Sequence, residues 1–117
     1  MKKRILLVED DAASRYAAEK VLFKAGFDVI TADDYSHALK LMESDEPIDL
    51  LLTDIVMPKG INGFALARMG RMRRTDLKVL YMTAYDMPSS HADGKILRKP
   101  ISENELVEEA KRVMEER

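Results

Sequence analysis

Short, uniformly apolar runs alternate with helical stripes along the chain, and this alternation limits the possible folds more than any other feature. Residues 5–8 are four successive aliphatic residues, as expected of a parallel strand that is covered on both faces. The next segment has apolar residues at i, i+3, i+4 and i+7, the spacing of one helical face: Ala18, Val21, Leu22 and Ala25. Gly26 then marks the end of the predicted helix.

The same alternation continues towards the C-terminus. Further strand-like runs occupy residues 29–31, 50–52, 79–82 and 95–97, and helical stripes cover about 35–44 and 64–72. Ser102 and Glu105 form an S-x-x-E capping box that opens a last amphipathic helix. The helical signal between residues 85 and 94 is poor, so we expect the fourth helix to be short or irregular.

Strands that alternate with helices imply a parallel sheet with helices on both faces. We therefore expect an α/β protein with a three-layer, doubly wound (βα)₅ flavodoxin-like fold and strand order 2-1-3-4-5. The length of 117 residues suits one hydrophobic core, so we expect residues 1–117 to form a single domain.

The composition excludes several classes of protein. With 46% hydrophobic and 34% charged residues the chain reads as globular rather than disordered. It has no cysteine, which excludes disulfides and thiolate metal sites and makes a reducing cytoplasm the expected location. The formal net charge of −2 gives no general attraction to nucleic acid or anionic lipid, and no stretch approaches the length of a membrane span. We expect a cytoplasmic domain that binds neither nucleic acid nor membrane directly.

Polar residues follow four of the five expected strands. They are Glu9, Asp10 and Asp11 after the first strand, Asp54 after the third, Thr83 after the fourth and Lys99 after the fifth. Because the carboxyl ends of parallel strands meet at one edge of the sheet, where ligands bind at the topological switch point, these residues should converge on one cleft.

The residue types in this cleft predict phosphoryl chemistry. Clustered carboxylates repel one another unless a cation or a proton intervenes, and all-oxygen ligands favour Mg²⁺. Aspartate is an established nucleophile for aspartyl-phosphate formation, and phosphoryl transfer needs mainly positioning and charge neutralisation. The sequence therefore predicts that Asp54 accepts a phosphoryl group in a Mg²⁺-dependent pocket, with Lys99 and Thr83 contacting its oxygens.

Each of these residues also has a simpler structural interpretation. Asp11 suits the N-cap of the first helix, Thr83 suits a β-branched strand residue, and a lysine before proline is usually solvated. The prediction therefore depends on the combination, with each residue type closing a different strand in this order.

Four short stretches carry a resemblance to a known family. They are residues 7–11 (LVEDD), 52–58 (LTDIVMP), 82–84 (MTA) and 98–100 (RKP). Together they resemble the receiver domains of two-component response regulators, which are CheY-like domains that occur alone or attached to hybrid kinases. The resemblance covers essentially the whole chain.

The resemblance implies a role for each matching position. Asp54 would be the phosphoacceptor. Mg²⁺ would be bound directly by Asp10 and the Val56 carbonyl, and through water by Glu9. Thr83 would be the switch hydroxyl, Ala84 the small residue beside the phosphate, and Lys99 the phosphate-binding lysine before a cis bond to Pro100. The phosphoryl donor would be a histidine kinase or a histidine phosphotransfer protein. The domain would then change its surface towards a downstream effector that the sequence does not identify. No enzymatic activity is expected beyond self-phosphorylation and autodephosphorylation at Asp54.

The chain departs from the family pattern in three places. The loop at residues 59–63 is one residue longer than usual, and the interval from Thr83 to Lys99 is several residues shorter. The aromatic switch residue expected three positions before the lysine is Ile96. Tyr85 is either a substitute gate or a residue that lines the mouth of the pocket. The way in which this chain would switch is therefore open.

Two other functions fit parts of the pattern. One is a receiver-like interaction module that works without phosphorylation, against which the complete set of acids, threonine and lysine argues. The other is an aspartate-nucleophile phosphatase. Such enzymes usually place a general acid two residues after the nucleophile, and that position is Val56 here.

Overall fold

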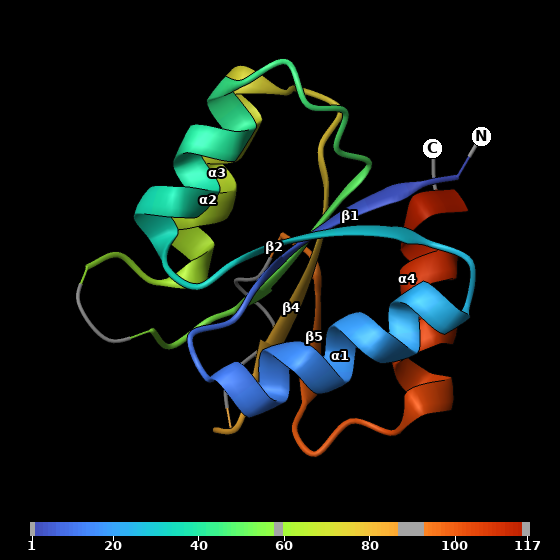
Figure 1. Cartoon of the computed structure of the whole chain (residues 1–117). Helices are drawn as coiled ribbons and strands as arrows, with labels where there is room; N and C mark the ends of the chain where they lie inside the picture. Colours follow the sequence, from blue (N-terminus) through green and yellow to red (C-terminus); the bar gives the residue numbers. More distant parts are fainter. Residues whose placement is uncertain (1, 58–59, 87–92, 116–117) are drawn as a thin grey trace.

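The apolar runs of the sequence form five parallel strands in a single sheet, ordered β2-β1-β3-β4-β5 as expected (Figure 1). The computed structural model describes residues 2–57, 60–86 and 93–115. The elements are β1 (Arg4–Val8), α1 (Ala12–Lys24), β2 (Asp28–Ala32), α2 (Tyr35–Glu43), β3 (Leu50–Asp54), α3 (Gly63–Arg73), β4 (Lys78–Thr83), β5 (Lys95–Arg98) and α4 (Glu103–Glu115). The fold is the predicted doubly wound α/β architecture.

Helices cover both faces of the sheet, which explains why the strands are apolar on both of their faces. The β3 residues Leu50 and Leu52 pack into a cluster with residues of α1 and α4, whereas Leu51 packs into a second cluster with residues of α2 and α3. Figure 1 shows α1 and α4 on one side of the sheet and α2 and α3 on the other. All three leucines are fully buried, and each contributes about 2 kcal/mol by removing apolar surface from water.

A polar cap starts each helix. Three side chains accept from a backbone N–H three residues on: Asp11 from Ser14 (2.8 Å), Asp34 from His37 (2.8 Å) and Asn62 from Ala65 (2.9 Å). The predicted cap at Ser102 is present as well, because its hydroxyl accepts from the Glu105 amide at 3.1 Å. These bonds satisfy amides that a helix leaves unpaired in its first turn.

The connection between β4 and β5 lacks a helix in the parts that the structure describes, residues 84–86 and 93–94. The predicted short or irregular fourth helix falls largely on residues 87–92, which lie outside the described residues. The label α4 accordingly denotes the helix that follows β5. Within the described ranges, no helix combines the length and hydrophobicity needed to cross a membrane.

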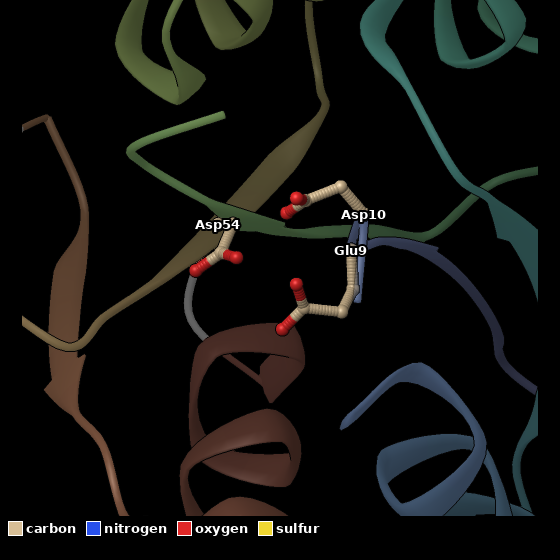
Figure 2. Close-up of side chains that lie close together, drawn as sticks. All are labelled: Glu9, Asp10 and Asp54. Carbon is tan, nitrogen blue, oxygen red and sulfur yellow. The ribbon is translucent and has the colours of Figure 1, made fainter. Parts of the chain in front are cut away.

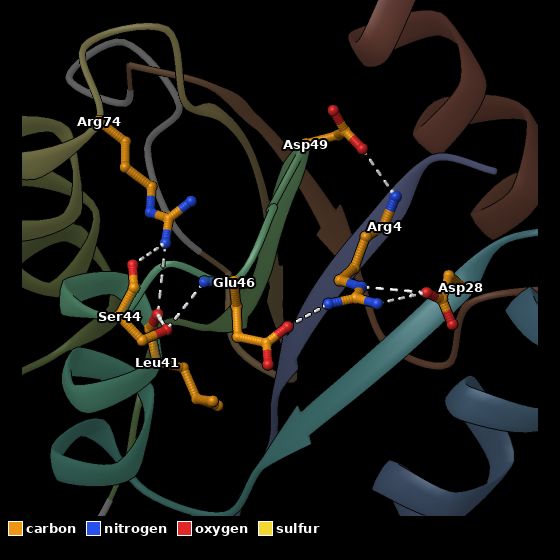
Figure 3. Close-up of polar contacts among 7 residues, drawn as sticks. All are labelled: Arg4, Asp28, Leu41, Ser44, Glu46, Asp49 and Arg74. Carbon is orange, nitrogen blue, oxygen red and sulfur yellow. Dashed lines mark hydrogen bonds and ion pairs between the residues drawn. The ribbon is translucent and has the colours of Figure 1, made fainter. Parts of the chain in front are cut away.

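Charged side chains tie the amino edge of the sheet together (Figure 3). The Arg4 guanidinium donates to Asp28 on β2 through Nε (3.0 Å) and Nη2 (2.8 Å), and it also pairs with Glu46. The Arg4 amide donates to Asp49 at 2.8 Å. This arginine therefore joins β1 to β2 and to the segment that leads into β3.

A second arginine joins α3 to the end of α2. Arg74, the C-cap of α3, donates through Nη2 to the Ser44 carbonyl at 2.8 Å (Figure 3). Its Nε donates to the Met42 carbonyl at 3.0 Å. The carbonyls at the end of a helix lack intrahelical partners, so a cationic donor there stabilises the helix end.

Candidate functional site

Asp54 is the last residue of β3 and lies at the carboxyl edge of the sheet, with only 6% of its surface exposed. The backbone around it is fixed by the Ile55 amide, which donates to the Met82 carbonyl at 2.9 Å, and by the Gly63 amide, which donates to the Ile55 carbonyl at 2.8 Å. The buried Thr53 hydroxyl donates to the Asp54 carbonyl at 2.9 Å. The Asp54 carboxylate is therefore held on a rigid strand end, as a nucleophile requires.

The acid pair after β1 faces Asp54. The Glu9 amide extends the sheet by donating to the Ala32 carbonyl of β2 at 3.1 Å, and its side chain is 2% exposed, whereas Asp10 is exposed. Figure 2 shows the side chains of Glu9 and Asp10 approaching Asp54 from the end of the neighbouring strand. One carboxylate oxygen from each of the three residues lies within 4.8 Å of the others.

Lys99 brings a positive charge to this acidic cluster. It follows β5, and its amide donates to the Thr83 carbonyl at 2.8 Å. Its Nζ lies 3.2 Å from each oxygen of Asp54 and forms an ion pair with Glu9. The peptide bond to Pro100 is cis, as the resemblance implied.

The proximity of these charges shifts their titration. Burial raises the pKa of Asp54 to about 7, the neighbouring Glu9 carboxylate adds to this rise, and Lys99 opposes it. Burial disfavours ionisation of Glu9 too, but hydrogen bonds with Asp54 and Lys99 outweigh it and lower the pKa of Glu9. Burial also acts against the charge of Lys99, yet the two carboxylates raise the pKa of this ammonium. The single ammonium group therefore does not offset the burial of both carboxyl groups, and the pKa of Asp54 stays raised.

The donor set fits a hard divalent cation. Glu9, Asp10 and Asp54 supply only carboxylate oxygens, which are the ligands that Mg²⁺ prefers, and they already lie close together. Burial first, and then Glu9, raise the pKa of Asp54. A bound cation would therefore stabilise the ionised form of this carboxylate.

The remaining predicted residues lie around this cluster with different exposures. Thr83 is buried, and its hydroxyl accepts from the Tyr85 amide at 3.1 Å. Ala84 is exposed, and the side chains of Val56 and Tyr85 are 47% and 60% exposed. The backbone amide of Tyr85 therefore contacts the threonine, while its ring faces solvent. Asp11 caps α1, and its amide donates to Glu9 at 3.2 Å, so it supports the pair from outside.

Ile96 packs against the core rather than replacing an aromatic ring. It lies in register with Tyr81 of β4, so a buried aromatic ring lies on the strand beside the expected position. Tyr81 is fully buried, contacts Phe64 edge to face at 4.9 Å, and donates its hydroxyl to Asp93 at 2.5 Å. The sequence pattern of Tyr81, inside an apolar strand, gave no sign of this contact.

Two further residues support the site without a motif of their own. Arg15 donates to the Glu9 carbonyl at 2.9 Å and holds the turn of the acid pair. Gly63 passes so close to β3 that a Cβ there would lie 2.3 Å from the Asp54 carbonyl oxygen. Gly63 ends the loop at residues 59–63 in the sequence, and only the packing shows why it must be small.

The sequence is similar to known signalling proteins over almost its full length. The family model described as response regulator receiver domain matches residues 5–111. The response regulator receiver protein CpdR of Brucella abortus is 40% identical, over 96% of this chain and 97% of that protein. Other curated relatives are longer, such as the response regulator MprA of Mycobacterium ulcerans, which is 35% identical over 92% of this chain; the chain spans 48% of its length.

Solved structures agree with this relationship. The receiver domain of the hybrid histidine kinase CckA is 34% identical with a TM-score of 0.84, over 96% of this chain and 99% of that one. The response regulator TrrA of Thermotoga maritima, solved in complex with Mg²⁺-BeF, is 34% identical with a TM-score of 0.81, over 95% and 98% of the two chains. The chain therefore belongs to the response regulator receiver domain family, the phosphoacceptor signalling domains of two-component systems.

Proposed function

We propose that Asp54 is the phosphoacceptor and that a phosphohistidine of a histidine kinase or phosphotransfer protein is its donor. The observation that carries this proposal is the position of Lys99, whose Nζ lies 3.2 Å from each Asp54 oxygen at the buried end of β3. A carboxylate held in this way has one face beside a cation and lies at an edge of the sheet that incoming groups can reach.

The transfer exchanges one bond to phosphorus for another. An Asp54 oxygen attacks the phosphorus atom, the bond from phosphorus to the histidine nitrogen breaks, and the imidazole keeps its electron pair. The product is an acyl phosphate on Asp54. Lys99 stays beside the negative charge throughout. The Thr83 hydroxyl accepts from the Tyr85 amide, so its own proton is available to a phosphoryl oxygen.

Glu9, Asp10 and Asp54, with the backbone carbonyl of Val56, would hold Mg²⁺. When bound, the ion supplies positive charge that offsets the repulsion between the carboxylates and an incoming phosphoryl group. The Mg²⁺-BeF complex of TrrA, a relative at 34% identity, supports this assignment.

Intact-mass spectrometry with acetyl phosphate tests the proposal. Wild-type protein in Mg²⁺ should gain the mass of one phosphoryl group, and Asp54→Asn should gain none. Asp49→Asn, at the amino edge of the sheet, is the matched control and should behave as wild type. EDTA should suppress the adduct. An unmodified wild type, or the same adduct on Asp54→Asn, contradicts the proposal. Sustained hydrolysis of p-nitrophenyl phosphate would point to a phosphatase instead.

A further inference from the structure

A second surface feature lies at the outer edge of the sheet, between α1 and β2. Two aromatic rings of α1 are strongly exposed there, Tyr16 at 64% and Phe23 at 63%. A groove of about 370 Å³ runs between them and the strand. We call it the α1–β2 groove, and its lining residues are Tyr16, Glu19, Lys20, Phe23, Asp28 and Val29.

The strand beside this groove has free backbone groups. The Asp28 amide donates to the Lys3 carbonyl and the Ala32 carbonyl accepts from Glu9, so alternate residues of β2 face β1. Val29 and Thr31 therefore direct their N–H and C=O groups away from the sheet. Among the described residues no strand except β1 pairs with β2, so β2 is an edge strand of the sheet in Figure 1. Such groups are a template for an added strand.

Positive charge lies directly beside the exposed rings. The Nζ atoms of Lys20 and Lys2 are each 5.7 Å from a ring centroid, of Tyr16 and Phe23 respectively. In the described ranges no carboxylate forms an ion pair with either lysine, whereas Asp28, the acid on the β2 side of the groove, is engaged by Arg4. Among the described residues, Glu19 is then the one lining acid without an ion pair, and it stands against Lys20 in the groove and Lys2 beside it.

This surface is separate from the phosphoryl site. Tyr16, Lys20 and Phe23 recur at i, i+4 and i+7 and so share one face of α1. The residues of α1 that line the cavity beside Glu9 and Lys99 are on its other flank: Ser14, Ala17, Ala18 and Val21. A molecule in the α1–β2 groove would not have to touch the acidic cluster.

We propose that the α1–β2 groove binds an extended segment of a partner protein, which adds a strand to the edge of β2. The Val29 and Thr31 backbone groups would supply the hydrogen bonds, and alternate apolar side chains of the segment would pack against Tyr16 and Phe23. Acidic residues flanking them would pair with Lys2 and Lys20. Lys2 and Lys20 together outnumber Glu19, so the groove favours an acidic segment over a second copy of the chain, which would bring the same excess of positive charge against itself.

Selection from a random dodecapeptide phage library tests the proposal. Wild-type protein is the bait, and a Tyr16→Ser/Phe23→Ser double variant is used for counter-selection. We expect peptides with apolar residues at alternate positions and flanking aspartate or glutamate. Both substituted residues are exposed, so the variant should keep its fold by circular dichroism and still be phosphorylated by acetyl phosphate. No enrichment of wild-type binders over the double variant would overturn the proposal.

The selected peptide, made synthetically, then reports the binding mode. Hydrogen exchange of the Val29 and Thr31 amides should slow when it binds, and N-methylation should abolish binding only at alternate peptide residues. Protection confined to other amides, or tolerance of methylation at every position, contradicts strand addition. Sedimentation that shows a dimer dissolved by the double variant would assign the groove to a second copy instead.

Matched single variants separate the contributions. Tyr16→Ser should weaken the selected peptide about 10-fold or more, while Met72→Ser, which replaces an 82% exposed residue of α3, should leave affinity unchanged. Lys20→Glu should weaken binding about 10-fold at low salt and less at high salt, and Lys24→Glu, outside the groove, should change it little. Equal effects of Lys20→Glu and Lys24→Glu would remove the charge complementarity from the proposal. Asp54→Asn should bind the peptide as wild type does, so failure here is distinguishable from failure at the phosphoryl site.

Discussion

At the amino edge of the sheet Arg4 lies among three carboxylates, and at the carboxyl edge Lys99 lies beside two of the three in the acidic cluster. The two clusters contain similar residue types, but their carboxylates differ in exposure. The side chains of Asp28 and Glu46, which pair with Arg4, are 47% and 45% exposed. Those of Glu9 and Asp54, which pair with Lys99, are 2% and 9% exposed.

Exposure decides what the same chemistry does at each edge. Water shares the charge of the acids around Arg4, so that cluster joins strands and stores little electrostatic energy. The buried acids around Lys99 have little solvent, and burial together with Glu9 raises the pKa of Asp54 to about 7. The carboxyl edge is therefore left short of positive charge, which is the condition that favours a cation and an anionic group bound together.

Replacing Lys99 should have the largest effect in either cluster. Lys99→Met should slow phosphorylation of Asp54 by acetyl phosphate by about 100-fold or more, because one donor to the transferring group is lost. Time-resolved intact-mass measurements in saturating Mg²⁺ would give the rate. Lys95→Met, an exposed lysine of β5, is the matched control and should react as wild type does. A rate for Lys99→Met within a few-fold of wild type would mean that the cation has no chemical role.

Asp54→Asn should stabilise the metal-free protein at neutral pH. Burial first, and the neighbouring Glu9 second, raise the pKa of this carboxyl group from 3.8 to about 7 in the folded chain. The folded state therefore binds the proton more tightly, and wild-type stability falls as pH rises from about 4 to 7. Above that window Asp54→Asn should be more stable by up to about 4 kcal/mol.

Urea unfolding in EDTA at several pH values measures this difference. The gain should shrink as the pH falls and vanish near the ordinary pKa of the carboxyl group, because both proteins are then uncharged at residue 54. Adding Mg²⁺ at pH 8 should also reduce the gain, since the ion stabilises only a site that keeps its charge. A gain that is the same at every pH would show that the Asn side chain packs better and that charge is not the cause.

At the other edge, Arg74→Met should destabilise the protein by about 1 kcal/mol, because the carbonyls at the end of α2 lose a charged donor. Arg73→Met is the control and should cost less, because this side chain is more exposed and, among the described residues, donates to Glu43 alone. Thermal unfolding compares the two, and phosphorylation should be unchanged in both. An equal loss of stability for the two variants would contradict a specific cap.

Arg4→Met should have the smallest effect of the four substitutions. Its acidic partners are half exposed and regain water when the arginine is lost, so a small drop in melting temperature is expected. The drop should lessen with added salt. A large, salt-insensitive loss would show that the amino edge depends on its charges as much as the carboxyl edge does.

The sequence predicted the fold because its signals are local. Each uniformly apolar run became a strand, and the caps at Asp11 and Ser102 start the helices that periodicity indicated. The candidate site was equally accessible, since a residue that closes a parallel strand must lie at the carboxyl edge whatever its neighbours do. Asp54 and Lys99 are 45 residues apart in the chain and in contact in the structure for this reason.

Contacts that depend on side-chain reach between elements gave no signal. Tyr81 looks like any apolar strand residue, and its bond to Asp93 needs both the register of β4 against β5 and the path of the connection between them. Arg74 carries no motif, and only the packing of α3 against α2 directs it to the carbonyls of Met42 and Ser44.

By itself, then, the sequence determined the order of strands and helices and the acids, hydroxyl and lysine that gather at one edge, because strand ends and periodicity are properties of neighbouring residues. Only the tertiary structure decided how deeply each charge is buried and which arginines hold helices together. It also decided that, within the described part of the chain, β2 pairs on one side alone and lies beside two exposed rings. Burial and edge position depend on what packs from elsewhere in the chain, and no local pattern records them.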